Sequence, residues 1–418
     1  MDMQPGAARR RKRLAVLALE LIQGMCFAAW SSRIPDIREG FGVENLAHLG
    51  LLMALIPVGK LLAIPAVHSL FSLAGYRKAV LISILGYAFS LLLAGILPAN
   101  LYILGFIFLL FGIFWNMTDI SLNTQAIEVD RLYETSIMAT FHAGWSFAAC
   151  LGALLGFALI NLNIGYPTHF TGIAVLSILG IGIAYRFLPL DHEHPVAVAV
   201  AGEVAQKKDE KKDGGKKRKL PEILLIQLGL IWLVALGVEN TIFEWSDLYF
   251  QSVIKAPKSL QVGFLIIMTT IFIGRLITTL LYRYWKKRTI LIVAGYLIFA
   301  GFMISSLLVK LTGDMTINVI INALGFGLIG LGISCVVPTL YSIVGEKAKT
   351  PVGTALTIMS SISFVGPFIP PLLVGTVSHY FGMDVAYLII GLFGLCIVGI
   401  TSFSKTLKRD EGISYYKR

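Results

Sequence analysis

Charged residues are scarce in this chain. They make up 14% of its 418 residues, whereas apolar side chains make up 56% and the mean hydropathy is +0.78. Soluble domains are about 25% charged and about 45–50% apolar. The low charge content therefore excludes an ordinary soluble globular protein and indicates a membrane protein.

Cysteine is scarce as well, with only Cys26, Cys150, Cys335 and Cys396. All four lie in apolar stretches and none has a CxxC spacing, so neither a disulfide framework nor a metal site is expected. The sequence also lacks a recognisable Ser/His/Asp or Cys/His nucleophile set. The GxGxxG pattern at 325–330 has no preceding strand, which a dinucleotide site requires. We therefore expect neither an enzyme nor a bound cofactor or metal.

Long apolar windows, in contrast, are abundant. Twelve windows of roughly 18–25 residues are long enough to cross a bilayer, the first at 14–32 and the last at 384–404. They predict an all-α membrane protein with twelve transmembrane helices. Its location is then the cell membrane, which the chain crosses many times, with the lipid bilayer around it.

Basic residues are unevenly distributed among the predicted loops. Of the 35 lysines and arginines, 28 lie at the two chain ends or in loops on the same side as those ends. Cytoplasmic loops are enriched in Lys and Arg, so both termini are predicted to be cytoplasmic. The net charge of +11 has the same explanation. No nucleic-acid partner is expected, because the Lys-rich run has no interleaved aromatic residues.

The main change in composition lies at residues 189–222, a charged segment poor in large apolar side chains. We interpret it as a basic cytoplasmic linker. It would join an N-terminal six-helix bundle at 1–188 to a C-terminal six-helix bundle at 223–418. The sequence thus predicts two halves of similar size.

A weak internal repeat supports the two halves. The segment LIPVGKLLAI (55–64) resembles TTIFIGRLIT (269–278), which places Lys60 opposite Arg275. Repeats related by an axis along the membrane normal build the two halves of one large class of transporters. The repeat therefore favours a transporter.

The clearest functional candidate is Asp119, an acid in the fourth window with no basic residue close in sequence. An ionised carboxylate within a spanning helix costs on the order of 3 kcal/mol. Asn123 lies one turn further along the same helical face and Asn116 nearly one turn before. One interpretation is a proton carrier beside two amides that bind solute. The other is a structural acid hydrogen-bonded to a neighbouring helix.

A second polar group lies in the seventh window, at GVENTIFEWSDLYF (237–250). Glu239 and Phe243 are one helical turn apart, and Asn240 follows the acid directly. A carboxylate, a carboxamide and an aromatic ring suit the hydroxyls and the ring face of a sugar. We predict proton coupling for Glu239 and solute binding for Asn240 and Phe243.

Four further side chains are candidates to line the solute path. Gln23 and Trp30 lie seven residues apart on the first predicted helix, and His142 and Trp145 share a face of the fifth. All four are predicted to contact the solute. For His142 two alternatives stay open, a proton relay and a hydrogen-bonded packing histidine.

Six charged residues are candidates for gates or ion pairs: Arg33, Asp36, Lys60, Glu128, Arg131 and Arg275. Arg33 and Asp36, at the outer end of the first helix, form either an outer gate or an ordinary helix-end ion pair. Glu128 and Arg131, at the cytoplasmic end of the fourth helix, are expected to form an ion network. The two basic residues inside spans are counter-ions for acids or for an anionic solute, or their stems extend to the membrane edge.

Several motifs resemble the major facilitator superfamily. AGYRK (74–78) follows the helix 2–3 signature of that superfamily, with Ser72 where the signature has Asp. Five longer motifs resemble bacterial permeases of the fucose–proton symporter type and their inner-membrane relatives. They are WSSRIPDIREGF (30–41), DISLNTQAIEVDR (119–131), FHAGWSFAACLGALLG (141–156), ENTIFEW (239–245) and FVGPFIPPLLVG (364–375).

This resemblance implies the major facilitator fold and a role for particular residues. In fucose permeases an acid and an Asn four positions later on helix 4 serve proton coupling and sugar binding, and Asp119 and Asn123 match that spacing. Those permeases also carry an Asp on helix 1, where this chain has Ser31. The implied protein is a monomeric secondary transporter of the bacterial inner membrane, with a small-molecule solute and protons as its partners.

Three functions are weighed on this basis. The first is proton-coupled import of a small polar solute, such as a sugar or sugar derivative, by alternating access. The second is efflux of amphipathic compounds driven by proton antiport. The third is a non-transporting receptor or scaffold whose function resides in residues 189–222.

Overall fold

The computed structural model describes residues 6–134, 137–189, 222–310 and 313–408. Every regular element in these residues is helical, and twelve helical stretches are long and apolar enough to cross a membrane. The predicted all-α class with twelve transmembrane helices is thus confirmed. Most of the predicted linker at 189–222 lies outside the described residues, and the cytoplasmic placement of the termini stays a prediction.

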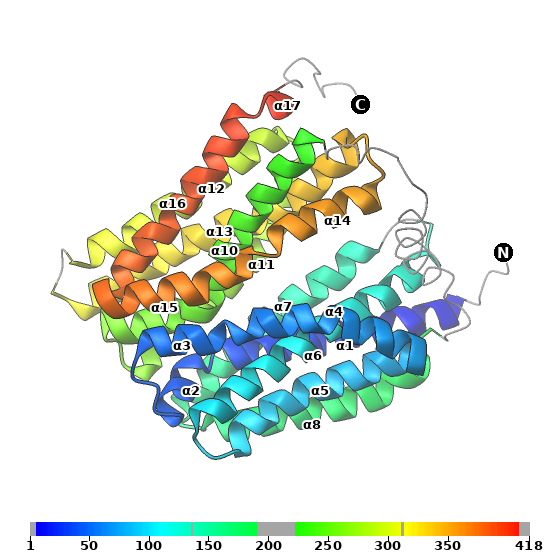
Figure 1. Cartoon of the computed structure of the whole chain (residues 1–418), viewed down its shortest axis with the longest axis horizontal. Helices are drawn as coiled ribbons and strands as arrows, with labels where there is room; N and C mark the ends of the chain where they lie inside the picture. The colour runs from blue at the N-terminus through cyan, green and yellow to red at the C-terminus, as the bar shows by residue number, and fades with distance from the viewer. Residues whose placement is uncertain (1–5, 135–136, 190–221, 311–312, 409–418) are drawn as a thin grey trace, which may run out of the picture. The chain divides into compact units, whose positions relative to one another are not determined.

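The chain forms these elements in order (Figure 1). The first half holds α1 (Gly6–Ser31), α2 (Ile34–Gly40), α3 (Leu46–Met53), α4 (Leu55–Ala74), α5 (Tyr76–Ile96), α6 (Leu101–Asp130), α7 (Met138–Asn161), α8 (Tyr166–Ala184) and η1 (Tyr185–Phe187). The second half holds α10 (Ile223–Tyr249), η3 (Phe250–Ile254), η4 (Lys258–Leu260), α11 (Gly263–Leu281), α12 (Lys287–Leu307), η5 (Leu308–Lys310), α13 (Met315–Lys347), α14 (Val352–Ser363), η6 (Gly366–Phe368), α15 (Ile369–Phe381), α16 (Met383–Phe403) and α17 (Lys405–Lys408).

Proline accounts for the breaks inside two of the spans. The second span is divided into α3 and α4 at Ala54, because Pro57 has no N–H to donate to the carbonyl of Met53 and its ring crowds that carbonyl. The eleventh span is divided into α14, η6 and α15 around Pro367 and the pair Pro370–Pro371. The helix is therefore interrupted in both spans close to prolines.

The described residues form two compact units. Unit 1 consists of the described residues within Met1–Trp30, Leu55–Gly152 and Gly165–Leu220. Unit 2 consists of the described residues within Ser31–Ala54, Ala153–Ile164 and Pro221–Arg418. Unit 2 therefore includes α2 and α3, which come from the first half of the sequence. The predicted division into bundles at 1–188 and 223–418 stays a prediction.

Unit 1 packs around aromatic side chains. In it α6 lies against α4 and α5, and α5 also lies against α8 (Figure 1). Phe111 is central to this core, with ring centroids 4.5 Å from Trp30, 4.9 Å from Tyr87 and 5.8 Å from Trp115. The core thus holds α1, α5 and α6 together near the position of Asp119.

Unit 2 has a second aromatic core. Here α12 packs against α13 and α16, α11 against α13, and α3 against α15. The ring of Tyr387 lies 4.4 Å from that of Tyr249 and 5.3 Å from that of Phe302, and Tyr249 donates a hydrogen bond of 2.8 Å to the carbonyl of Ser305. The buried phenol of Tyr249 thus has the partner that its burial requires.

Candidate functional site

Two glycines set the crossing of α4 and α6 in unit 1. A Cβ on Gly59 would lie 2.3 Å from the carbonyl oxygen of Leu109, and a Cβ on Gly112 would lie 2.1 Å from that of Ile56. Any larger residue would push the helices apart, so glycine permits this close backbone approach. The crossing brings Lys60, the next residue on α4, directly against α6.

Lys60 is directed at α6 from the middle of its span. Its Nζ lies 3.3 Å from the centroid of the Trp115 ring, in a cation–π contact. The side-chain amide of Asn116 donates a hydrogen bond of 2.7 Å to the Lys60 carbonyl oxygen. Lys60 also interacts electrostatically with Asp119, one turn beyond Trp115. This geometry favours a counter-ion over a stem that extends to the membrane edge.

Asp119 lies among polar groups from three other helices of unit 1. Its side chain is exposed although it belongs to the apolar span Leu101–Asp130. The Gln23 carboxamide of α1, Lys60 of α4 and the exposed His142 of α7 interact with it. The predicted residues Asp119, Gln23, Lys60 and His142 are therefore brought together. Proton coupling and solute binding by them stay predictions.

The Gln23 side chain is of particular interest within this cluster. It is only 1% exposed and lies beside Asp119. Within the described chain, neither Oε1 nor Nε2 makes a hydrogen bond of normal geometry. A buried carboxamide without well-formed hydrogen bonds is costly, and a bound solute or water would satisfy it. Gln23 thus has the chemistry expected of a binding group.

Small residues also bring α1 against α7. A Cβ on Gly24 would lie 2.5 Å from the carbonyl oxygen of Trp145, and a Cβ on Gly152 would lie 2.6 Å from the Ala28 side chain. The half-buried Trp145 ring packs 5.3 Å from Phe27. This contact between helices places Gln23 and His142 on neighbouring segments beside Asp119.

Glu20 is a member of the cluster that the sequence did not single out. It is buried on α1, one turn before Gln23, and feels the charge of Asp119. The signal was present in the sequence as an acid three residues before a glutamine inside an apolar span. Its partner Asp119 lies about a hundred positions away, so only the fold shows that the two acids are neighbours.

The other predicted residues of α6 are placed differently. Asn123 donates a hydrogen bond of 2.9 Å to the backbone oxygen of Asp119, one turn earlier on the same helix. Its amide oxygen thus remains to interact with a solute. Glu128 is buried near the end of α6 and forms an ion pair of 3.6 Å with Arg131. Trp30 is 1% exposed and packs on Phe111, so its burial is accounted for by the aromatic core.

In unit 2, Glu239 and Arg275 form the corresponding pair of opposite charges. Arg275 of α11 interacts electrostatically with Glu239 of α10. A Cβ on Gly274 would lie 2.1 Å from the Ser334 hydroxyl of α13. A glycine at a tight helix crossing thus precedes the basic residue in both units, at positions that the sequence repeat aligns.

The neighbours of Glu239 on α10 are largely buried. Asn240 donates a hydrogen bond of 2.8 Å to the carbonyl of Leu236. Phe243 contacts Phe264 edge to face, with centroids 6.5 Å apart. Their predicted roles in solute binding are untested.

An ion-pair network in unit 2 joins α2 to η4, which precedes α11. Arg33 is 2% exposed and pairs with Asp36 at 2.8 Å, while its other nitrogen donates to the Ile164 carbonyl at 2.9 Å. Lys258 lies 2.8 Å from both Asp36 and Glu39. The pair predicted from the sequence is therefore part of a larger network, and its function as a gate stays a prediction.

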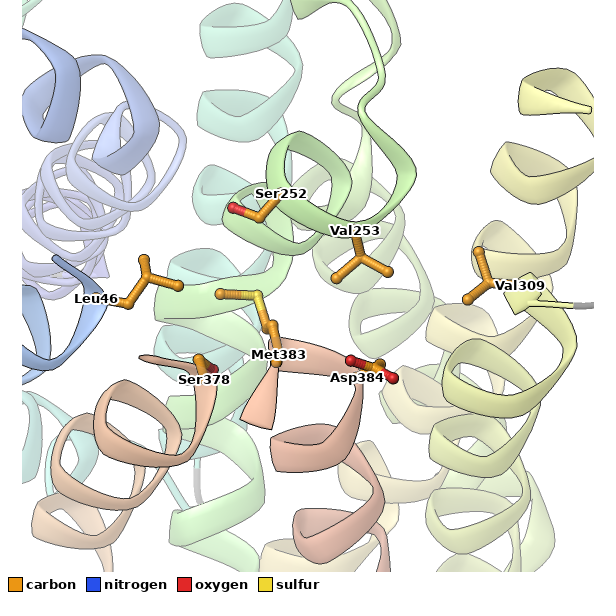
Figure 2. Close-up of a pocket in the computed structure, with 8 residues that line it drawn as sticks. Leu46, Ser252, Val253, Val309, Ser378, Met383 and Asp384 are labelled. Carbon is orange, nitrogen blue, oxygen red and sulfur yellow. The ribbon is translucent and has the colours of Figure 1, made fainter. Parts of the chain in front are cut away.

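Unit 2 also contains a pocket of about 360 Å³. It lies where α10 and α12 end and α16 begins, and none of the predicted solute-binding residues lines it (Figure 2). Its wall includes Ser252, Ser378 and the Asp384 carboxylate (Figure 2). Among the described residues no group of three His, Cys, Asp or Glu side chains forms a metal site.

Comparison with known proteins identifies the family to which these features belong. The family model described as Major Facilitator Superfamily matches residues 16–354. The chain is 26% identical over 381 residues to the "Uncharacterized transporter y4wD" of Sinorhizobium fredii, covering 90% of this chain and 94% of that one. It is 23% identical over 399 residues to "Membrane protein MosC" of Rhizobium meliloti, covering 94% and 90%.

Solved structures with the same fold are also transporters. A D-xylose–proton symporter matches with a TM-score of 0.69 at 13% identity, covering 94% of this chain and 98% of the other. The nucleoside transporter NupG also matches with a TM-score of 0.69 at 13% identity, covering 93% and 99%. At these identities the likeness shows the fold alone.

Proposed function

This chain belongs to the major facilitator superfamily of multi-pass membrane transporters, and we propose that it imports a small polar solute, such as a sugar or a sugar derivative, together with protons. Membership of this family and relatives named as transporters mean that the chain is a transporter rather than an enzyme. Among solved neighbours, a D-xylose–proton symporter has the same fold. The proposal concerns proton coupling, the solute and the direction of transport.

The observation that carries the proposal is the polar cluster around Asp119. Asp119 is an exposed acid inside an apolar span, with Glu20, Gln23, Lys60 and His142 around it. Ionisable residues inside membrane spans are costly and mark ion and substrate pathways. Asp119 would load and release the proton as the transporter alternates between its two open states.

For each unit taken by itself, we propose solute binding by its polar and aromatic groups. In unit 1 the Gln23 carboxamide, the Asn123 amide oxygen and the Trp145 ring would contact the solute. In unit 2 Glu239 and Asn240 would do so, with Glu239 as a second proton-coupling acid. Transporters of this class bind solute near the bilayer midplane and change state by rocking of one bundle against the other.

The test is solute-driven proton flux in proteoliposomes that contain the full chain. The panel comprises hexoses, deoxysugars, amino sugars and sugar acids. Asp119→Asn is compared with Asp314→Asn, which makes the same charge change at the N-cap of α13, where Asn caps as well as Asp. We expect one solute to drive proton uptake in the wild type and in Asp314→Asn. Asp119→Asn should lose proton uptake but keep solute counterflow.

Other outcomes separate the alternatives. A panel without flux and without binding would argue against import of sugars, and proton-driven efflux of amphipathic compounds would then be measured. A chain that lacks residues 195–215 should keep full flux. Solute binding without flux in the wild type, unchanged in Asp119→Asn but lost in that deletion, would favour a non-transporting receptor or scaffold.

A further inference from the structure

Lys60 has the geometry of a counter-ion to Asp119, and binding of a neutral sugar gives its charge no further role. A lysine in the middle of a membrane span is as costly as an acid there. A neutral sugar needs hydrogen-bonding groups, which Gln23 and Asn123 already provide. A fixed cation beside the proton-loading acid therefore indicates a further requirement of the solute.

The geometry keeps the Lys60 ammonium in place at the site. Its Nζ lies 3.3 Å from the Trp115 ring centroid, and the glycine crossing at Gly59 prevents α4 from moving away from α6 without loss of packing. The indole face attracts the cation but accepts no strong hydrogen bond. The contact with the ring therefore leaves the hydrogen bonds of the ammonium to be made with oxygen-bearing groups.

Asp119 is an oxygen-bearing group that interacts electrostatically with this cation. Opposite charges in a region of low dielectric interact strongly, so Lys60 and the ionised carboxylate stabilise each other. When Asp119 takes up a proton, that attraction is removed. An anion from the solute would then be the natural replacement partner of Lys60.

The charges around Asp119 decide when an anion can bind beside Lys60. The titratable groups around it are Glu20 from α1, Lys60 from α4, Tyr87 from α5 and His142 from α7. The helix α8 carries only Tyr166 and His169, both in its first turn. With both acids ionised and His142 neutral, the cluster carries one net negative charge and disfavours an anion. Each proton that the cluster takes up makes the binding of an anion more favourable.

We propose that the transported solute carries a carboxylate, and that Lys60 binds this group on the face of Trp115 once Asp119 is protonated. The inference rests on the proposed proton-coupled import and specifies its substrate class as sugar acids. One lysine supplies one positive charge, which matches a monoanionic carboxylate better than a dianionic phosphate ester. Binding of the proton then raises the affinity of the transporter for the anion, and binding of the anion raises its affinity for the proton, as linkage requires.

The experiment measures binding by calorimetry to the purified full chain, using matched pairs of solutes. Each pair is a hexose and the hexuronate that differs from it only by oxidation of the terminal CH₂OH: glucose with glucuronate, galactose with galacturonate and mannose with mannuronate. We expect one uronate to bind at least about tenfold more tightly than its hexose, as a charge-assisted hydrogen bond provides. Its affinity should fall about tenfold per pH unit above the range in which the acid is protonated.

The variants assign this preference to particular side chains. Lys60→Met should bind the hexose and the uronate within about twofold of each other, and Lys60→Gln serves if the Met variant does not fold. Lys78→Met makes the same change at an exposed lysine of α5 in unit 1 and should keep the preference. Asp119→Asn, which is permanently neutral, should keep the preference for the uronate but lose its pH dependence.

Several results would overturn the inference. One is uronate preference that survives in Lys60→Met, and another is tighter binding of a hexose phosphate than of the uronate. A panel in which no uronate binds is a third. If a neutral hexose binds best and drives proton flux that Asp119→Asn abolishes, the anionic solute is excluded while proton-coupled import stands. If neither binding nor flux occurs with any sugar, both proposals fail together.

Discussion

The tight crossing of α4 and α6 gives a quantitative prediction for Gly59→Ala. The added Cβ would lie 2.3 Å from the Leu109 carbonyl oxygen, 2.8 Å from the Ile113 nitrogen and 3.1 Å from the Gly112 Cα. Ordinary van der Waals contact begins at 3.4 Å, so the two helices must move apart by about 1 Å. All three contacts are with backbone atoms, which cannot rotate out of the way.

The expected cost follows from overpacking. Inserting a methyl group into a packed contact costs about 1–3 kcal/mol, and the backbone contacts here favour the upper end. Replacing glycine by alanine within a helix also stabilises the helix by up to about 1 kcal/mol, because alanine has the higher helix propensity. We therefore expect Gly59→Ala to destabilise the chain by about 2 kcal/mol.

The matched control is Gly182→Ala in α8. No heavy atom lies within 4 Å of the Cβ it would add, so only the gain in helix propensity applies. The two variants should differ by about 2–3 kcal/mol, which corresponds to a difference of about 5 °C in melting temperature. Melting is followed by tryptophan fluorescence of the detergent-purified chain, and the pH dependence of solute binding is measured on both. Equal melting temperatures would refute the close approach of α4 and α6, and with it the argument that places Lys60 on Trp115.

Three further predictions concern unit 2 and are checked by the same melting assay. Lys258→Met removes both ion pairs to α2. Because Lys258 is 53% exposed, the loss of stability should be only about 1 kcal/mol and should vanish in 1 M salt. A loss that persists in salt would contradict an electrostatic origin. Arg33→Ala leaves a buried ion pair broken and should cost about 3 kcal/mol, clearly more than Lys258→Met, and equal losses would contradict the burial of Arg33. Hydrogen bonds from the Thr350 hydroxyl and from the backbone N–H groups of Lys349 and Thr350 lower the pKa of Glu222 below 4.5. A carboxylate whose pKa is lower in the folded chain stabilises the fold at a pH above its pKa in the unfolded chain. This stabilisation is lost as the pH falls through the pKa of the folded chain. Glu222→Gln should therefore be less stable than the wild type at pH 7 and equal to it well below pH 4.5.

Hydropathy was sufficient to predict the fold, because each span must satisfy its own backbone hydrogen bonds in lipid. The twelve spans and the breaks at Pro57 and Pro367 depend on local sequence alone. The membership of α2 and α3 in unit 2 depends on contacts between residues hundreds of positions apart, such as the one between Lys258 and Asp36. No local pattern contains that information.

The candidate site was predictable only in part for the same reason. Asp119 and Gln23 were recognisable as polar residues in apolar spans. The contact of Lys60 with Trp115 was not predictable, because it depends on how closely α4 and α6 approach at Gly59. Glu20 lies in the same helix as Gln23, yet its relation to Asp119 appears only when α1 and α6 are packed.

The placement of α3 in unit 2 has a consequence for how the protein would respond to cleavage. A protease that cuts within residues 189–222 divides the chain into an N-terminal and a C-terminal fragment. The α3 helix of the first fragment packs against α15 of the second, with Gly50 and Gly375 so close that a Cβ on Gly50 would lie 2.1 Å from the Pro371 oxygen. The fragments should therefore stay associated after cleavage, and two separately expressed genes for them should complement each other to give a working transporter.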